Sequence, residues 1–75
     1  MTISELDAKG LLCPLPVLKA RRAMKGLPVG GILRVLATDA GAPADFRHFC
    51  DTTGAELVSS TEEAGVFVIE LRKTR

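Results

Sequence analysis

Residues 6–18 have the sequence LDAKGLLCPLPVL, which predicts a strand that passes through a turn into a helix. Gly10 marks the turn. Pro14 and Pro16 suit the first turn of a helix, where a missing N–H costs little and the fixed φ is already helical. The stretch therefore places the thiol of Cys13 at a strand–helix junction. Unpaired N–H groups and the positive dipole end at a helix start favour a thiolate, so we expect a lowered pKa for Cys13.

The spacing after Cys13 also indicates what this thiol does not do. A Cys-x-x-Cys redox pair would have its second thiol at position 16, which is Pro16 in this chain. A reactive thiol without a neighbouring resolving thiol is better suited to carrying a group than to closing a disulfide. A purely structural cysteine is the alternative, because free cysteines are often small buried residues. The two prolines and the helix start favour a functional Cys13.

Length and composition restrict the class of protein. The chain has 75 residues, 47% of them apolar and 25% charged, which indicates one small globular domain spanning residues 1–75. Ten basic and nine acidic residues give a net charge of +1, without a global signature of nucleic-acid binding. The N-terminus lacks the apolar run of a signal peptide, and no stretch approaches the roughly 20 apolar residues of a membrane span. Two cysteines are too few for a disulfide scaffold. We expect a cytoplasmic monomer without membrane or direct nucleic-acid contact.

The hydrophobic pattern predicts the element order β-α-β-α-β-β. Connections through helices favour parallel strands, whereas a tight turn at residues 62–65 favours an antiparallel final pair. We therefore expect an α/β two-layer sandwich, with two helices on one face of a mixed four-stranded sheet. The strands are expected at residues 3–8, 32–38, 56–60 and 66–72, and the helices at residues 14–27 (or 16–27) and 43–53.

Both expected helices are amphipathic. Pro43 suits the first position of the second helix, Asp45 lies in its first turn, and Gly54 suits the left-handed residue that follows its end. The inward stripes are formed by Val17, Ala20, Met24 and Leu27 in the first helix and by Phe46, Phe49, Cys50 and Thr53 in the second.

The outer face of the first helix is basic and carries no acid. Such a face is most often only solvated, but its imbalance also suits docking onto an acidic surface of a partner protein close to the thiol. It adds positive potential near Cys13, and it is too small and too poor in aromatic residues for RNA binding. The residues are Lys19, Arg21, Arg22 and Lys25.

For four further residues we favour a structural role over a functional one. Cys50 lies on an apolar stripe and is expected in the core, with pairing to Cys13 as the alternative. His48, the only histidine, is expected to be exposed, with a general-base role as the alternative. Asp7 and Asp39 lie at expected strand ends, where small α/β sites form, and we favour hydrogen bonds to nearby loops. No cluster has metal-ligand spacing, so we expect neither a metal nor a cofactor.

One set of residues extends over most of the chain: Leu6-Asp7-x-x-Gly10-x-x-Cys13-Pro14-x-Pro16, Gly31 before and Thr38-Asp39 after the second strand, and Asp45 ahead of Phe49-Cys50. With these residues the chain resembles the TusA/SirA family of small sulfur-carrier proteins over essentially its full length. Many members have proline after the aspartate that follows the second strand, where this chain has Ala40-Gly41, and isoleucine-proline where it has Phe46-Arg47.

This resemblance implies a persulfide relay. Cys13 would accept sulfane sulfur from a donor such as a cysteine desulfurase and pass it to an acceptor protein, for tRNA thiolation, molybdenum-cofactor metabolism or sulfur oxidation. It would act as a carrier rather than as a stand-alone multiple-turnover enzyme. Two alternatives stay open: a non-catalytic binding or regulatory module of the same fold, and a thiol redox sensor that pairs Cys13 with Cys50. The expected site-shaping residues are Asp7, Gly10, Pro14, Pro16 and Asp39.

Overall fold

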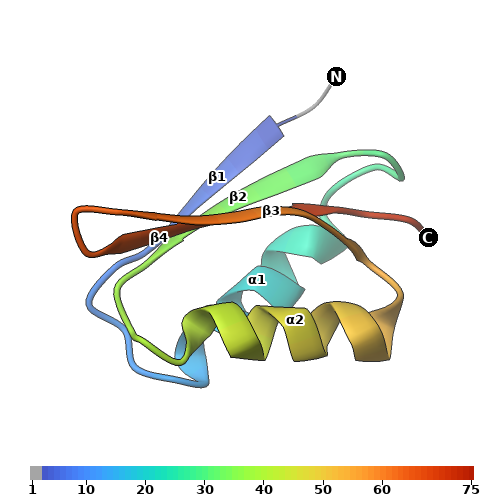
Figure 1. The fold of residues 1–75 in the computed structure, drawn as a ribbon. Helices are drawn as coiled ribbons and strands as arrows, with labels where there is room; N and C mark the ends of the chain where they lie inside the picture. Colours follow the sequence, from blue (N-terminus) through green and yellow to red (C-terminus); the bar gives the residue numbers. More distant parts are fainter. Residues whose placement is uncertain (1–2) are drawn as a thin grey trace.

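The computed structural model describes residues 3–75 and has the element order β-α-β-α-β-β. The elements are β1 (Ile3–Ala8), α1 (Leu15–Lys25), β2 (Ile32–Ala37), α2 (Ala42–Thr53), β3 (Glu56–Glu63) and β4 (Val66–Arg72). Both helices lie on one side of a four-stranded sheet (Figure 1). The predicted two-layer α/β sandwich is therefore confirmed. No helix within residues 3–75 is long and apolar enough to cross a membrane.

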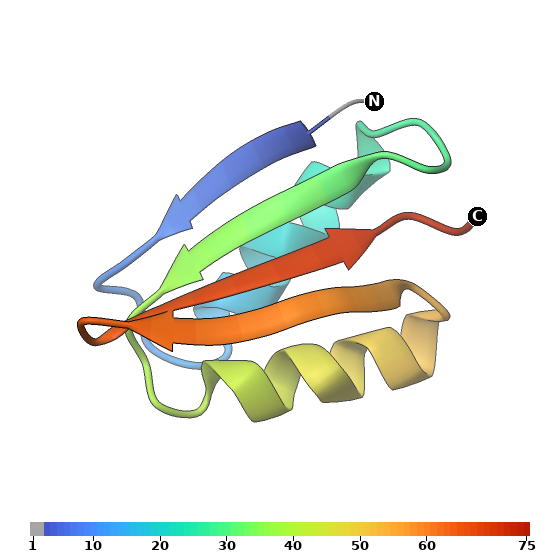
Figure 2. The ribbon, with the colours of Figure 1, turned by 45° about the horizontal axis from the view of Figure 1, so that its top comes forward.

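The sheet has the strand order β1-β2-β4-β3, so the last strand lies between β2 and β3 (Figure 2). β1 is parallel to β2, and β4 is antiparallel to both of its neighbours. A central strand has neighbours on both sides, which agrees with the complete burial of Ile69 and Leu71 in β4. This order could not be obtained from the hydrophobic pattern, because β2 and β4 are far apart in the sequence.

The final hairpin differs from the prediction. Glu62 and Glu63, expected in the turn, belong to β3 and pair with the first two residues of β4. The turn is formed by Ala64 and Gly65, which both have positive φ, 52° and 81°. Two consecutive residues with positive φ are typical of the tight turns that match the twist of paired strands. The predicted third strand was therefore too short at its C-terminal end.

The other boundaries shift by only one or two residues. α1 ends at Lys25 with Gly26 as its C-cap, and Leu27, expected as its last residue, is buried just beyond it. α2 starts at Ala42 rather than Pro43. β2 ends at Ala37, one residue early. Helix and strand ends are the part of an element that local sequence determines least.

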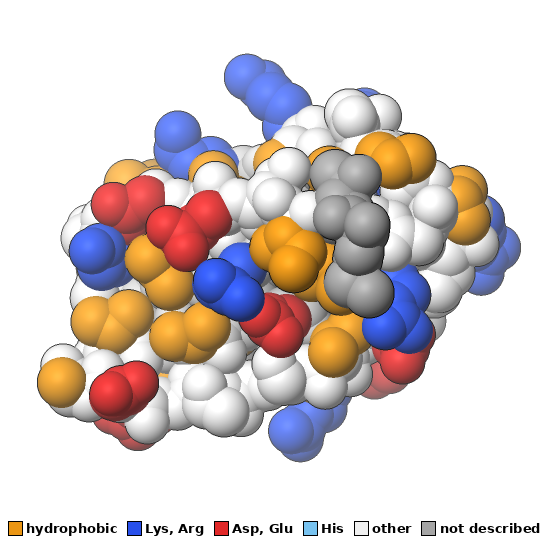
Figure 3. Space-filling model, turned by 90° about the horizontal axis from the view of Figure 1, so that it is seen from above, with side chains coloured by type: hydrophobic (Ala, Val, Ile, Leu, Met, Phe, Trp, Pro, Cys, Tyr) orange, Lys and Arg blue, Asp and Glu red, His pale blue; other side chains and the backbone are white. Residues whose placement is uncertain are grey.

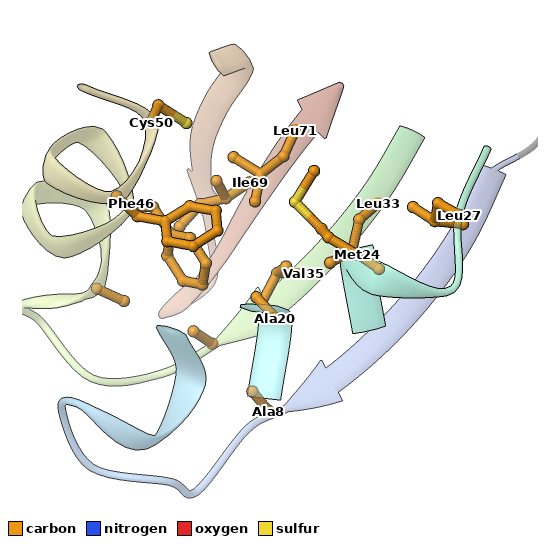
Figure 4. Packing of buried hydrophobic residues seen from close by; sticks show 13 residues of the cluster. Ala8, Ala20, Met24, Leu27, Leu33, Val35, Phe46, Cys50, Ile69 and Leu71 are labelled. Carbon is orange, nitrogen blue, oxygen red and sulfur yellow. The ribbon is translucent and has the colours of Figure 1, made fainter. Parts of the chain in front are cut away.

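The core lies between the helices and the sheet. Phe46 of α2 points at Ile69 and Leu71 of β4, while Ala20 and Met24 of α1 cover β2 (Figure 4). Phe46 is fully buried and its ring packs edge-on against that of Phe49. Each fully buried large side chain contributes roughly 1.5–3 kcal/mol relative to exposure. This cluster holds both helices against the sheet.

The face of the sheet that the helices leave open carries a polar row across all four strands, with charged residues on β1, β2 and β4 and a serine on β3. Arg34 pairs with Glu70 at 2.9 Å and lies 3.9 Å from Glu5. Ser59 donates to the other oxygen of Glu70. The hydrogen bond from Arg34 lowers the pKa of Glu70, and Ser59 adds to the effect. Figure 3 shows this face, with hydrophobic side chains among acidic and basic ones. The row ties the four strands together on the side away from the helices.

The parallel pairing of β1 and β2 brings the starts of both helices to one end of the molecule (Figure 1). The carboxyl ends of two parallel strands lie at the same edge of a sheet, and each strand here is followed by a helix. The loop that carries Cys13 and the first turn of α2 are therefore neighbours in space, although they are far apart in the sequence.

Candidate functional site

Cys13 lies in the loop between β1 and α1, and it is exposed. The loop is attached to the sheet edge at Gly10, whose N–H donates to Oγ1 of Thr38, the residue after β2, at 2.9 Å. Gly10 has a φ of +82°, a backbone conformation that glycine adopts without steric cost. The turn that positions the thiol thus needs a glycine at position 10 and a hydroxyl beyond β2.

The two prolines of the motif have different roles. Pro14 is the N-cap residue of α1; it is exposed, and its peptide bond to Cys13 is cis. Pro16 lies inside the first turn and is fully buried. Pro14 therefore lies beside the thiol, and Pro16 packs the start of the helix onto the core.

Asp45 of α2 contacts the thiol directly. The Sγ atom of Cys13 donates a hydrogen bond to Oδ2 of Asp45. The sequence placed Asp45 in the first turn of α2 but did not assign it to the site. The signal that could have found it is topological, because two helices that follow parallel strands start at the same sheet edge.

The expected lowering of the Cys13 pKa is wrong. The hydrogen bond to Asp45 raises the pKa of Cys13 above its ordinary value, with smaller contributions from desolvation and from the negative charges of Asp45 and Asp39. A carboxylate accepts a hydrogen bond from a thiol but repels a thiolate, so it favours the protonated form.

The helix start offers little to oppose this effect. The N–H of Leu15 donates to the carbonyl of Leu12 at 2.9 Å, and that of Leu18 donates to the carbonyl of Pro14 at 3.1 Å. Pro16 has no N–H. The backbone N–H of Val17 is the one that remains in the first turn of α1. The prolines that predicted a helix start therefore also remove donors that would have stabilised a thiolate.

A shallow groove of about 470 Å³ surrounds Cys13 and runs between the two helices. Asp45 and His48 line it from α2, one turn apart. Arg21 lines it from α1, with its guanidinium 5.6 Å from the centre of the Phe49 ring. His48 is exposed, as predicted, but it also shares a groove with the thiol, which sequence reasoning did not foresee.

The four basic residues of α1 divide between two sides of the helix. Lys19 and Arg22 line a hollow of about 390 Å³ with Leu6, Leu15 and Leu18, toward β1. Arg21 and Lys25 face α2 and line a basic hollow of about 290 Å³ together with the C-terminal residues Lys73 and Arg75. Only Arg21 also lines the groove of Cys13, so the structure brings one of the four candidate docking residues to the thiol.

The remaining candidates lie around the site rather than in it. Asp7 accepts a hydrogen bond from the N–H of Lys9, and Asp39 accepts one from the N–H of Gly41 ahead of α2. These are the loop-directed bonds that the sequence favoured. Cys50 is 7% exposed and belongs to the core, as expected from its stripe. Among residues 3–75 no group of three or more His, Cys, Asp or Glu side chains could hold a metal ion.

Known proteins share both the sequence and the fold of this chain. A family model described as sulfurtransferase TusA matches residues 4–73. The sulfur carrier protein TusA of Allochromatium vinosum is 46% identical over 70 residues, which cover 93% of this chain and 92% of that protein. The protein of the same name from Pseudomonas syringae pv. syringae is 44% identical over 70 residues, 93% of this chain and 83% of that protein.

The fold is also found in a solved structure. A SirA-like protein from Desulfitobacterium hafniense superposes with a TM-score of 0.82 over 99% of this chain and 100% of that one, at 22% identity. At that identity the likeness supports the architecture alone. The match to the family model and the identities to curated relatives go further and confirm the predicted resemblance. The chain belongs to the TusA sulfurtransferase family.

Proposed function

We propose that this protein is a sulfur carrier that holds sulfane sulfur as a persulfide on Cys13. The observation that carries the proposal is an exposed, unpaired thiol at the mouth of a groove, with Pro16 where a resolving thiol would otherwise stand. Relatives that are 44–46% identical over nearly the whole chain are named as sulfur carriers, which supports the same role. The second thiol, Cys50, is buried in the core and does not line the groove.

The transfer needs no external oxidant. The Cys13 sulfur, after losing its proton, attacks the outer sulfur of a donor persulfide R–S–SH and forms a new S–S bond. The donor's S–S bond breaks, and its electron pair leaves with the donor sulfur, which takes up the proton that Cys13 released. Cys13–SH and R–S–SH thus become Cys13–S–SH and R–SH. The same exchange in the opposite sense delivers the sulfur to an acceptor.

The partners follow from this chemistry. We propose a donor protein that bears a persulfide, such as a cysteine desulfurase, and an acceptor protein with a receptive thiol. Arg21, which lines both the thiol groove and the neighbouring basic hollow, is the best placed of the candidate docking residues. Both cysteines are free, which suits a reducing compartment, and we propose the cytoplasm as the site of action.

The test is transfer from a persulfide-loaded cysteine desulfurase, followed by intact mass and peptide mapping. We expect the protein to gain one sulfur atom on Cys13. The Cys13→Ala variant should gain none, and the matched Cys50→Ala variant should gain as much as the natural protein. Absence of sulfur on Cys13 at every donor concentration would favour the non-catalytic module. Loss of two hydrogens with a Cys13–Cys50 link would instead identify the redox sensor.

A further inference from the structure

The contact between Cys13 and Asp45 is not explained by the needs of folding. Cys13 is exposed, so water could satisfy its thiol without a protein partner. The side chain of Asp45 does not cap its own helix, since no side-chain hydrogen bond caps the start of α2. The backbone N–H of Asp45 donates to the carbonyl of Gly41. A carboxylate in the first turn of one helix is directed at a thiol before the start of the other.

The surroundings of the thiol reinforce the effect of Asp45. Asp39, two residues after β2, adds a second negative charge that acts on Cys13. Arg21, the Lys or Arg residue that lines the groove, lies over the ring of Phe49, and among residues 3–75 it forms no ion pair with either aspartate. His48 also lines this groove, from α2. The thiol end of the groove is therefore acidic, whereas the neighbouring hollow is basic.

We propose that Asp45 is a positioning residue that holds Cys13 in its protonated, weakly nucleophilic form until a sulfur-donor protein docks and pairs a cationic side chain with Asp45. The inference rests on the proposed function and adds a condition to it. Once the donor's cation takes over the carboxylate, the thiol loses its hydrogen-bond acceptor and a repelling charge is neutralised. The proton of Cys13 can then move to the departing donor sulfur.

This arrangement predicts selectivity between sulfur donors. A small persulfide of net negative charge, such as glutathione persulfide, is repelled by the two aspartates and has no docked surface that would hold a cation against Asp45. A docked protein that presents a lysine or arginine beside its persulfide meets neither obstacle. Asp45 would thus keep the resting carrier from exchanging sulfur with small molecules.

The first experiment measures the rate of iodoacetamide alkylation of Cys13 against pH, with the modified peptide identified by mass spectrometry. Asp45→Asn should move the midpoint of the profile to lower pH. Each unit of downward shift raises the thiolate fraction about tenfold and lowers its nucleophilicity about threefold, so the rate at pH 7 should rise about threefold per unit.

Asp51→Asn is the matched control. It removes the same charge from an exposed position of the same helix that does not line the groove, and it should leave the Cys13 profile unchanged. If Asp45→Asn moves the midpoint no further than Asp51→Asn, the proposal is overturned. Circular dichroism and a urea midpoint establish that both variants fold.

The second experiment compares sulfur uptake from glutathione persulfide with uptake from a persulfide-loaded desulfurase at pH 7. Asp45→Asn should raise uptake from the small donor severalfold and raise uptake from the protein donor less. If Asp45→Asn raised uptake from both donors by the same factor, the proposal that docking of the donor protein releases the thiol would be overturned. Failure of the proposed function has a different signature, since the natural protein would then take no sulfur from the protein donor while the alkylation profile still shifted.

Discussion

Cys13 and Cys50 are both free thiols, but their environments differ. Cys13 is exposed beside a carboxylate, whereas Cys50 is 7% exposed in the core. Asp45 raises the pKa of Cys13 through a hydrogen bond, and burial raises the pKa of Cys50, with a smaller effect of Asp51. Both thiols are therefore mostly protonated at neutral pH, and access decides which of them reacts.

We predict that iodoacetamide modifies Cys13 and spares Cys50 in the folded protein at pH 8. The Cys13 rate should keep rising above pH 8.5, the ordinary thiol pKa, because a raised pKa delays formation of the thiolate. In urea both thiols should react. Peptide mapping measures this, and the Cys13→Ala variant, which should stay unlabelled when folded, is the control. Equal labelling of both thiols in the folded protein would contradict the burial of Cys50.

At the scale of single elements, the two helices end in different ways at a glycine. Gly54 follows α2 with a φ of +82°, and its N–H donates to the carbonyl of Cys50. Gly26 follows α1 with a φ of −86°, which any residue adopts. The sequence predicted the left-handed position of Gly54 because a glycine after the last turn is the usual way to end a helix.

We predict opposite effects for alanine at these two positions. Gly54→Ala should lower the free energy of unfolding by about 1–2 kcal/mol, because an L-residue pays that amount in the left-handed region. An added Cβ would also displace the Arg75 side chain. Gly26→Ala should be neutral or raise stability by about 0.4–1 kcal/mol, since its nearest neighbour would lie 3.6 Å away and the unfolded chain loses freedom. Urea unfolding measures both variants. An equal loss in the two would refute the conformational explanation.

At the scale of the whole molecule, one small core holds two helices against the sheet. A 75-residue chain buries only about 60% of its unfolded surface, so each large core side chain supports a substantial part of the stability. Phe46 is fully buried and packs against Phe49, which lines the groove of Cys13. Packing of α2 and geometry of the site are therefore coupled.

We predict that Phe46→Ala lowers the free energy of unfolding by about 3–5 kcal/mol, since it leaves a cavity in the core. That amount is comparable to the roughly 5 kcal/mol total of a marginally stable domain, so the variant should be largely unfolded at 37 °C. Val29→Ala is the control, because Val29 is 66% exposed, and it should change stability by no more than about 0.5 kcal/mol. Thermal and urea unfolding followed by circular dichroism test both. A cooperative, unshifted transition for Phe46→Ala would contradict this view of the core.

Local patterns predicted the elements well where one physical rule dominated. The apolar stripe of α2, from Phe46 to Cys50, faces the core as the helical period requires. The prediction of the final hairpin was wrong at Glu62 and Glu63. These polar residues extend β3 because their backbone groups pair with β4, while β3 lies at the edge of the sheet. No local pattern distinguishes such a strand end from a turn.

The sequence by itself determined the element order, the two-layer architecture and the family, and it showed that Pro16 stands where a resolving thiol for Cys13 would be. These depend on local periodicity, on proline and glycine, and on a short motif. Only the tertiary structure decided the strand order, the division of the α1 cations between two hollows, and the contact of Asp45 with Cys13. The protonation of the thiol depends on that contact, because parallel pairing of β1 and β2 brings together residues from distant parts of the chain. The effect of the Asp45 carboxylate on the Cys13 thiol depends on the distance between them. That distance is fixed by the folded arrangement of the chain, and local sequence alone does not predict it.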